Sequence, residues 1–184
     1  MEFEHLAVGV CGLSCRLCPR FHTDGSSRCG GCKSPFRMGA GCPFITCAVK
    51  KKGIELCTDC VEGETCERWK RHRELSKTVD SFVCYQKLED NIRSIKRHGI
   101  EAFEETQEKR CKLLEEMMAE FDDGRSKSFY CVAATLMEPE ELEGAIAFAG
   151  ASSTGKALKE KAKVMHKVLE DIAREKGYHL ALRK

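Results

Sequence analysis

The sequence predicts a mainly α-helical protein with small β elements, in which an amino-terminal cysteine-rich module packs on a carboxy-terminal helical domain. Ten of the 13 cysteines fall between residues 11 and 66, together with all but one of the four prolines. Hydrophobic periodicity is nearly absent there, which is typical of loops and tight turns held by ligands. After Cys66, apolar residues recur at helical intervals within charged stretches. We therefore assign residues 1–66 to a cysteine-rich metal-binding module and residues 67–184 to a helical domain.

Start and stop signals divide the helical domain into six predicted helices. These are 67–76, a helix capped by Asp80 and ended by Gly99, 100–121, 128–137, 139–149, and a last helix capped by Ser153 or Thr154 that ends at residue 176. Pro139 suits the first turn of its helix. The tail, residues 178–183, has the alternation of a short strand or of an extended clamp that docks back on the body.

The charge balance argues against nucleic acid and membranes as partners. The chain has 31 basic and 29 acidic residues, so its formal charge of +2 offers no basic footprint. The amino terminus lacks the basic residues of a secretory signal, and no apolar run approaches the roughly 20 residues of a membrane span. We therefore expect a cytoplasmic protein, in which dense cysteines remain thiols and bind metal.

The cysteines of the module have the spacing of metal ligands. They are Cys11, Cys15, Cys18, Cys29, Cys32, Cys42, Cys47, Cys57, Cys60 and Cys66. Three C-x-x-C pairs occur among them, and two such pairs complete a tetrahedral zinc site with Zn–S distances of about 2.3 Å. One economical division gives residues 15, 18, 29 and 32 to a first site, like a zinc ribbon or knuckle, and residues 42, 47, 57 and 60 to a second. It leaves Cys11 and Cys66 as substitutes or as ligands of an interleaved arrangement, and spacing alone does not decide the pairing.

A [4Fe-4S] cluster is the alternative to zinc, because it also takes four thiolates. The Cys18-Pro19 and Cys42-Pro43 pairs resemble those of ferredoxins, although the complete ferredoxin run is missing. Residues 11, 15 and 18 copy the cysteine triplet of radical-SAM enzymes, but the chain is too short and too poor in strands for their barrel. His5 and His22 are the nearby imidazoles, and we interpret both as solvated side chains.

The order of these motifs resembles a prokaryotic family catalogued as domain of unknown function 3795. The likeness is carried by Cys11-Gly-Leu-Ser-Cys15-Arg-Leu-Cys18-Pro19, Cys29-Gly-Gly-Cys32, the segment from Cys47 to Cys57-Thr-Asp-Cys60, and Cys66-Glu-Arg. It covers roughly residues 8–70, with Thr65 where that family commonly has proline. The resemblance implies metal binding by the cysteines and a prokaryotic cytosol. It implies no reaction, since the family has no assigned function.

Two other motifs invite a functional interpretation. Arg125, Lys127 and Ser128 stand before a predicted helix start, where free amides attract anions, so this turn is a candidate anion site. Residues 150–157 nearly spell a phosphate-binding loop, but Ala157 replaces the hydroxyl residue that holds magnesium, and we interpret the segment as a junction between helices. The three cysteines after residue 66 occupy apolar surroundings that favour core packing.

The leading functional hypothesis is a non-enzymatic adaptor or binding protein stabilised by structural zinc. It follows from the closed four-cysteine spacing and from the lack of a convergent acid, base or nucleophile set, so we predict no catalytic residues. A protein partner or a small anionic ligand is the expected kind of partner. The alternatives are an iron–sulfur electron-transfer or redox protein of an anaerobe, and an enzyme that binds an anionic substrate at the turn of residues 125–128.

Overall fold

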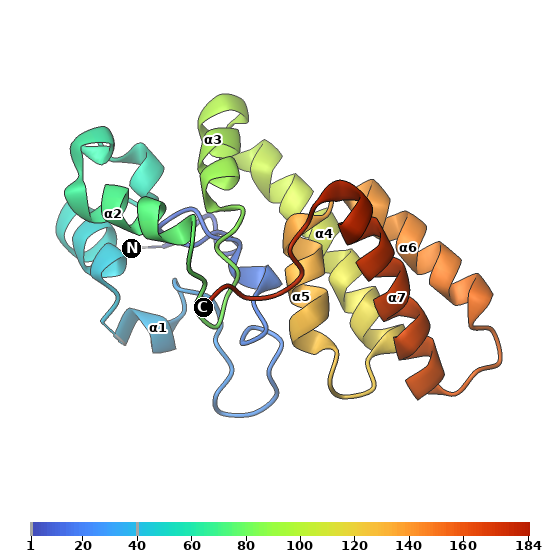
Figure 1. Cartoon of the computed structure of the whole chain (residues 1–184). Coiled ribbons are helices and arrows are strands. Elements are labelled where there is room, and N and C mark those ends of the chain that lie inside the picture. The colour runs from blue at the N-terminus through green and yellow to red at the C-terminus, as the bar shows by residue number, and fades with distance from the viewer. Residues whose placement is uncertain (1, 40) are drawn as a thin grey trace.

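The computed structural model describes residues 2–39 and 41–184 and is mainly helical, as predicted (Figure 1). Its α-helices are α1 (Pro35–Gly39), α2 (Glu67–Ser76), α3 (Leu88–His98), α4 (Ile100–Phe121), α5 (Lys127–Leu136), α6 (Pro139–Ser152) and α7 (Leu158–Lys176). The cysteine-rich region adds the 3-10 turns η1 (Cys15–Leu17), η3 (Cys57–Asp59) and η4 (Gly63–Thr65), and the π-helical segment η2 (Ile45–Lys51).

The predicted small β elements are absent from the part of the chain that the model describes. It has no strand there, only an isolated bridge that pairs Val8 with Ser14. The turns between the cysteines are closed by 3-10 hydrogen bonds instead of by strand pairing. The cysteine-rich region therefore packs on the helices as a set of tight turns, without the hairpins of a zinc ribbon.

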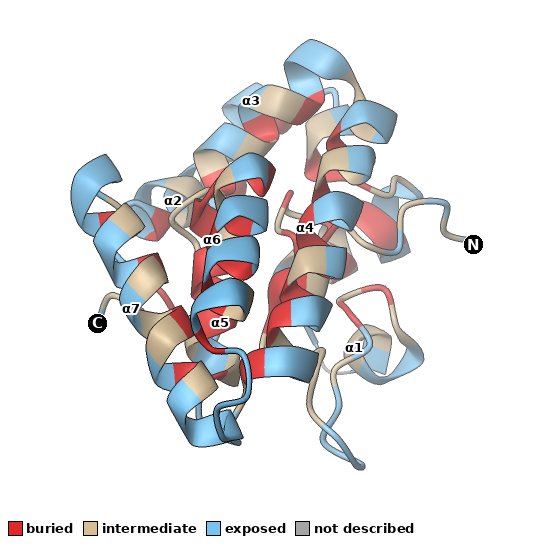
Figure 2. Ribbon diagram, turned by 90° about the vertical axis from the view of Figure 1, so that its right-hand side faces the viewer, coloured by how far each residue is buried: buried red, intermediate tan, exposed pale blue. Residues whose placement is uncertain are grey.

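Helices α4 to α7 pack around one hydrophobic core. Leu114, Met117, Tyr130, Met165 and Leu169 are completely buried in it. Figure 2 shows the buried faces of these helices turned towards one another and their exposed faces turned outwards. Amphipathic helices of this kind are stabilised mainly by burial of the apolar stripe. No helix among the described residues is long and apolar enough to cross a bilayer.

A second core lies in the amino-terminal half and draws on both sides of residue 66. Val10 and Ile45 from the cysteine-rich region pack there with Trp69 of α2 and with Leu88 and Ile92 of α3. Helices α2 and α3 therefore bury their apolar sides against the cysteine-rich turns. The stability of this half therefore depends on a small apolar core between the cysteine-rich turns and these two helices.

Most predicted helix bounds are confirmed, whereas two predicted caps are wrong. Helix α2 and helix α4 begin and end where the sequence predicts. Asp80 does not begin a helix: α3 starts only at Leu88, because the Asp80 carboxylate is occupied by other partners. Helix α7 starts at Leu158 after Ala157, and Ser153 instead ends α6, where its Oγ donates a hydrogen bond to the Ala149 carbonyl at 2.6 Å.

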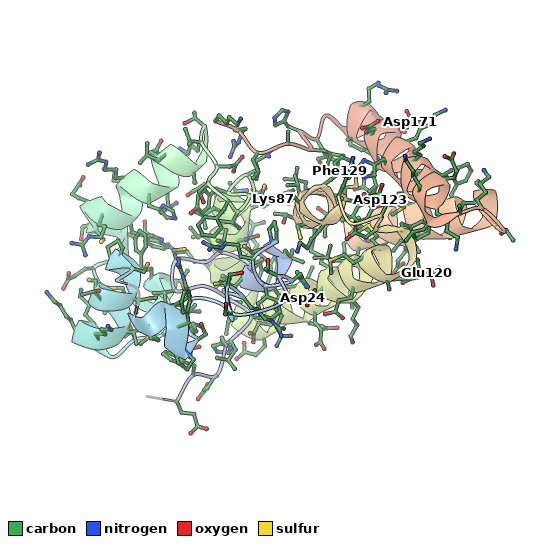
Figure 3. The ribbon with its side chains drawn as sticks, turned by 90° about the horizontal axis from the view of Figure 1, so that it is seen from below. Asp24, Lys87, Glu120, Asp123, Phe129 and Asp171 are labelled. Atoms are coloured by element: carbon green, nitrogen blue, oxygen red, sulfur yellow. The ribbon has the colours of Figure 1, made fainter. Side chains whose placement is uncertain are left out.

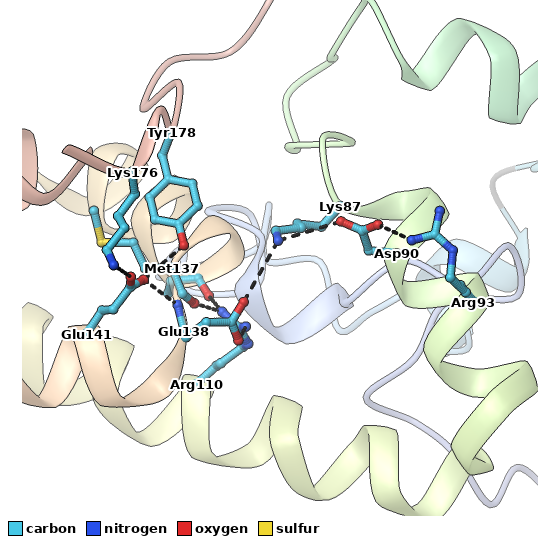
Figure 4. A network of polar contacts seen from close by, with 10 residues as sticks. Lys87, Asp90, Arg93, Arg110, Met137, Glu138, Glu141, Lys176 and Tyr178 are labelled. Carbon is cyan, nitrogen blue, oxygen red and sulfur yellow. Dashed lines mark hydrogen bonds and ion pairs between the residues drawn. The ribbon is translucent and has the colours of Figure 1, made fainter. Parts of the chain in front are cut away.

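A polar network joins the two halves of the molecule (Figure 4). The buried Arg110 of α4 donates to the Glu138 carboxylate at 2.7 Å and to the carbonyls of Ala134 and Met137, at the junction of α5 and α6. Glu138 also lies 3.9 Å from Lys87, which precedes α3. The guanidinium therefore satisfies carbonyls at the end of α5 that the helix itself leaves without partners.

The carboxy-terminal tail crosses back from α7 to the amino-terminal half (Figure 1). The Gln86 side chain donates to the carbonyls of His179 and Ala181 at 3.1 and 3.0 Å. Arg183 donates through Nε to Asp80 Oδ2 at 2.9 Å, and through its other nitrogens to Asp80 Oδ1 and to the carbonyls of Ser76 and Lys77. The tail is extended without being a strand, so of the two predicted forms the clamp is confirmed.

Replacement of Arg183 by Ala is expected to lower the free energy of unfolding by about 2–3 kcal/mol, because it leaves the buried Asp80 carboxylate without its charged partner. Burial acts to raise the pKa of Asp80, but the hydrogen bonds from Arg183 and from the Tyr85 amide outweigh it, so the pKa is lowered from its usual 3.8. The stabilisation is therefore present above that pH and is lost as the pH falls below it.

Urea unfolding of both proteins between neutral and acidic pH measures this effect. The difference between the wild type and R183A should shrink in acid. Arg174→Ala is the matched control, because its exposed pair with Asp171 within α7 should contribute nothing measurable. An R183A protein as stable as R174A would contradict the clamp.

Candidate metal-binding sites

The ten cysteines of the amino-terminal half line two neighbouring cavities. Cys11, Cys15, Cys18, Cys29, Cys32 and Cys42 line a cavity of about 310 Å³, which we call the six-cysteine cavity. Cys47, Cys57, Cys60 and Cys66 line a pocket of about 50 Å³, which we call the four-cysteine pocket. All ten are free thiols, and the ring of Phe44 contributes to the walls of both cavities.

This grouping differs from the division that C-x-x-C spacing suggests. Cys42 lies with the first group and not with Cys47, because it precedes a helical segment that contains Cys47. Cys42 therefore lines one cavity from before η2, and Cys47 lines the other from within it. Cys66 joins Cys57 and Cys60, since the turn η4 brings the chain back to them. The two cavities therefore keep each C-x-x-C pair together and place Cys42 and Cys66 differently from that division, and which cysteines share a metal stays a prediction.

Two of the three C-x-x-C pairs owe their geometry to 3-10 turns. The Cys18 amide donates to the Cys15 carbonyl at 3.2 Å, and the Cys60 amide donates to the Cys57 carbonyl at 3.3 Å. Side chains three positions apart eclipse one another in such a turn, so both sulfur atoms of a pair lie on the same side. Between Cys29 and Cys32, Gly31 has a φ of +88°, which residues other than glycine rarely adopt.

The thiols of the four-cysteine pocket face one another closely enough to perturb ionisation. Burial, followed by the proximity of Cys66, Cys47 and Cys60, raises the pKa of Cys57 to about 12. The ammonium group of Lys52 lies 3.4 Å from the Cys60 sulfur and 2.7 Å from Glu62. A cation thus stands beside one of the partly exposed thiols of the pocket, where it offsets thiolate charge.

The six-cysteine cavity combines thiols with an aromatic wall. The rings of Phe21, Phe44, Phe82 and Tyr85 line it. Cys32 accepts a hydrogen bond from the Val10 amide at 3.1 Å. A hydrogen bond from Cys15, together with the Val10 amide and the nearby Lys33, outweighs the opposing effect of burial and lowers the pKa of Cys32 to about 7. Burial, followed by the proximity of Cys32, raises the pKa of Cys11.

A buried ion pair connects the two cysteine sites. Lys33, next to Cys32, has only 1% of its side chain exposed and lies 2.6 Å from the Glu55 carboxylate. Its ammonium group also donates to the His5 carbonyl at 2.6 Å. Glu55 precedes Cys57 by two residues, and its carboxylate also accepts hydrogen bonds from the amides of Glu4 and His5. The loops that carry the two sites are therefore held by one lysine and one glutamate.

The donor set of both cavities suits a soft or borderline metal, since thiolates prefer zinc and iron–sulfur clusters. As placed, no three His, Cys, Asp or Glu side chains among the described residues lie close enough together to hold a metal ion. Each cysteine sulfur moves by rotation about a single bond. Metal binding therefore requires such rotations towards the centre of each cavity, while the turns that carry the cysteines stay in place.

His72 is the site residue that sequence reasoning missed. It lies on α2 and lines the six-cysteine cavity. The two histidines considered from the sequence line neither cavity: His5 Nδ1 lies 2.8 Å from Glu104, and His22 Nε2 lies 2.6 Å from the Arg16 carbonyl. No spacing relates His72 to a C-x-x-C pair, and it reaches the cavity only because α2 packs on the cysteine-rich turns.

The candidate anion site at residues 125–128 is largely occupied by its own side chains. The Asp122 carboxylate accepts hydrogen bonds from the amides of Gly124 and Ser126, and the Asp123 carboxylate accepts one from the Arg125 amide. Asp123 lies close to α5 and α7 in Figure 3. Arg125 lines a surface depression there, but neither Lys127 nor Ser128 does, and Lys127 donates to the His22 carbonyl at 3.3 Å. The turn is therefore held by carboxylates in the places that an anion would take.

The other sequence motifs have structural roles. Residues 150–157 join α6 to α7 as predicted, and they follow a helix where a phosphate-binding loop would follow a strand. Cys111 and Cys131 are buried in the core of α4 to α7, and Cys84 packs with Val132 and Leu136. The prediction that these three cysteines serve core packing is confirmed.

Comparison with known proteins adds no relative. No family model, no curated protein and no solved structure matches the chain. The likeness to the uncharacterised cysteine-rich family stays a prediction from the sequence motifs, and the functional argument depends on the geometry of the two cysteine sites.

Proposed function

We propose that this protein is a metal-binding protein whose four-cysteine pocket holds one structural zinc ion. The observation that carries the proposal is the convergence of Cys47, Cys57, Cys60 and Cys66 on a pocket of about 50 Å³. This volume is about a sixth of that of the six-cysteine cavity, which favours an occupant as small as a single ion. Four thiolates complete the tetrahedral shell of zinc.

The chemistry of the pocket favours a structural ion over a catalytic one. A catalytic zinc keeps three protein ligands and an open position, whereas four cysteines leave none. Four thiolates and Zn²⁺ carry a net charge of about −2, which the adjacent Lys52 partly offsets. The adaptor or binding role that we predict from the sequence agrees with such a closed site, since the metal has no position for a substrate.

Metal analysis of matched cysteine variants tests the proposal. Cys57→Ala is expected to lose one equivalent of zinc from protein purified in reducing buffer. Cys111→Ala is the control, because it makes the same substitution in the core of α4 to α7, outside both cysteine sites. Equal zinc contents in the two variants, or a wild type without zinc, would overturn the assignment of the four-cysteine pocket.

An iron–sulfur cluster is a second candidate for the six-cysteine cavity, and the cavity volume is what favours it. At about 310 Å³, the cavity is far larger than a single ion requires. Six sulfur donors and an amide that donates to sulfur are features that hold and tune such clusters. Anaerobic purification decides the matter: iron with acid-labile sulfide supports an electron-transfer role, and zinc in both sites supports the purely structural one.

A further inference from the structure

The Nε2 atom of His72 is a buried polar atom without a hydrogen-bond partner, the one such side-chain atom found among the described residues. A buried nitrogen without a partner loses the hydrogen bonds that it would make with water, so native proteins rarely contain one without a compensating role. A metal ion is a partner that would satisfy an imidazole nitrogen.

The surroundings of His72 hold its ring beside the thiols. The imidazole lies between the rings of Phe44 and Tyr85, with centroid distances of 4.9 and 5.3 Å. All three rings line the six-cysteine cavity. Neighbouring aromatic side chains on both sides restrict the rotation of the imidazole and exclude water from it. The ring is therefore fixed in place before any ligand arrives.

We propose that Nε2 of His72 is a metal ligand in the six-cysteine cavity, which makes that site a mixed thiolate and imidazole site. The inference rests on the proposed metal-binding function and adds a residue to it. Zinc and iron–sulfur clusters both accept such mixed ligands, and imidazole in place of thiolate lowers the negative charge of the site. Burial lowers the pKa of His72, which favours the neutral ring that metals bind.

His72→Phe separates this role from simple packing, because phenylalanine keeps the aromatic contacts and removes the nitrogen. His22→Phe is the matched control, since His22 belongs to the same half, has a partner for its Nε2, and does not line the cavity. After challenge with a competing chelator, H72F should contain one equivalent of metal less than the wild type. The metal affinity of the six-cysteine cavity should fall by at least about tenfold. H22F should keep its metal.

The visible absorption of bound cobalt reports the ligands of the metal, and it would not change if His72 served packing alone. Protein reconstituted with Co²⁺ should show different visible absorption in H72F, because the ligand set of one cobalt changes. His72→Cys is the rescue variant: it should restore the bound cobalt and raise the thiolate-to-cobalt charge-transfer absorption. If H72F fails to fold, the comparison of H72C with the wild type still measures the ligand change.

The possible failures are distinguishable. An H72F protein with unchanged metal affinity and an unchanged cobalt spectrum would overturn the His72 assignment and leave the proposed function intact. A wild type whose only metal equivalent disappears in Cys57→Ala would do the same, since the six-cysteine cavity would then hold none. A wild type that binds no zinc, iron or cobalt at all would overturn both.

Discussion

Removal of zinc from the four-cysteine pocket is expected to unfold the amino-terminal half while α4 to α7 keep their helices. Structural zinc in small peptides contributes about 10–16 kcal/mol, which is folding free energy because the unfolded chain has no preformed site. That is comparable to the whole free energy of unfolding of a typical domain, about 5–15 kcal/mol. The core around Trp69 is small, whereas α4 to α7 have a separate core. That separate core contains none of the ten cysteines, and Leu17 packs into it from the cysteine-rich region.

Trp69 makes this experiment specific to one half of the molecule. It is the one tryptophan of the chain, is completely buried, and lines the four-cysteine pocket. A chelator should shift its fluorescence to that of exposed tryptophan, while far-ultraviolet circular dichroism retains most of the helical signal. Added zinc should restore the fluorescence. Loss of both signals together would contradict independent stability of the two halves, and unchanged fluorescence after proven removal of zinc would contradict the folding role of the metal.

Lys33→Met should lower the free energy of unfolding by about 3–5 kcal/mol, the usual cost of removing one partner from a buried ion pair. Glu55, with 12% of its side chain exposed, would lose the ammonium group that offsets its desolvation. Burial acts to raise the pKa of Glu55, but the bonds from Lys33 and from two amides prevail and lower it. The pair therefore stabilises the protein above pH 4.5, the usual pKa, and less as the pH falls further.

Denaturant unfolding of metal-loaded protein measures this change, and two further variants interpret it. Lys163→Met is the control, because its exposed pair with Glu160 should contribute nothing measurable. The double variant Lys33→Met, Glu55→Met should lose less stability than Lys33→Met alone, since no carboxylate then remains buried without its partner. A single variant that matches K163M would show that the pair does not hold the cysteine loops together.

Helix ends were predicted well where a glycine directly after the helix terminates it. Gly99 and Gly177, both with positive φ, end α3 and α7 as expected. The start of α3 could not be predicted, because the natural capping residue Asp80 is taken by Arg183, which lies 103 positions away. Capping rules consider neighbours in sequence, and a partner from the tail overrides them.

In the candidate sites too, features set by residues close in sequence were predicted, and features set by the packing of distant segments were not. The C-x-x-C pairs are local turns, so their spacing predicted them. The placement of Cys42 and Cys66 depends on how η2 and η4 turn the chain, and this needs the packed structure. His72 reaches its cavity through the docking of α2, and a helix that looks basic and solvated in sequence carries no sign of that.

The clamp at Arg183 sets an order of events during translation. Residues 82, 83 and 85 form part of the wall of the six-cysteine cavity, and Asp80 orients them through the Tyr85 amide. A ribosome adding roughly 5–20 residues per second needs about 5–20 s to travel the 103 positions from Asp80 to Arg183. The ten thiols thus spend seconds outside the ribosome before that wall is secured, in a nascent chain open to cellular metal ions and oxidants.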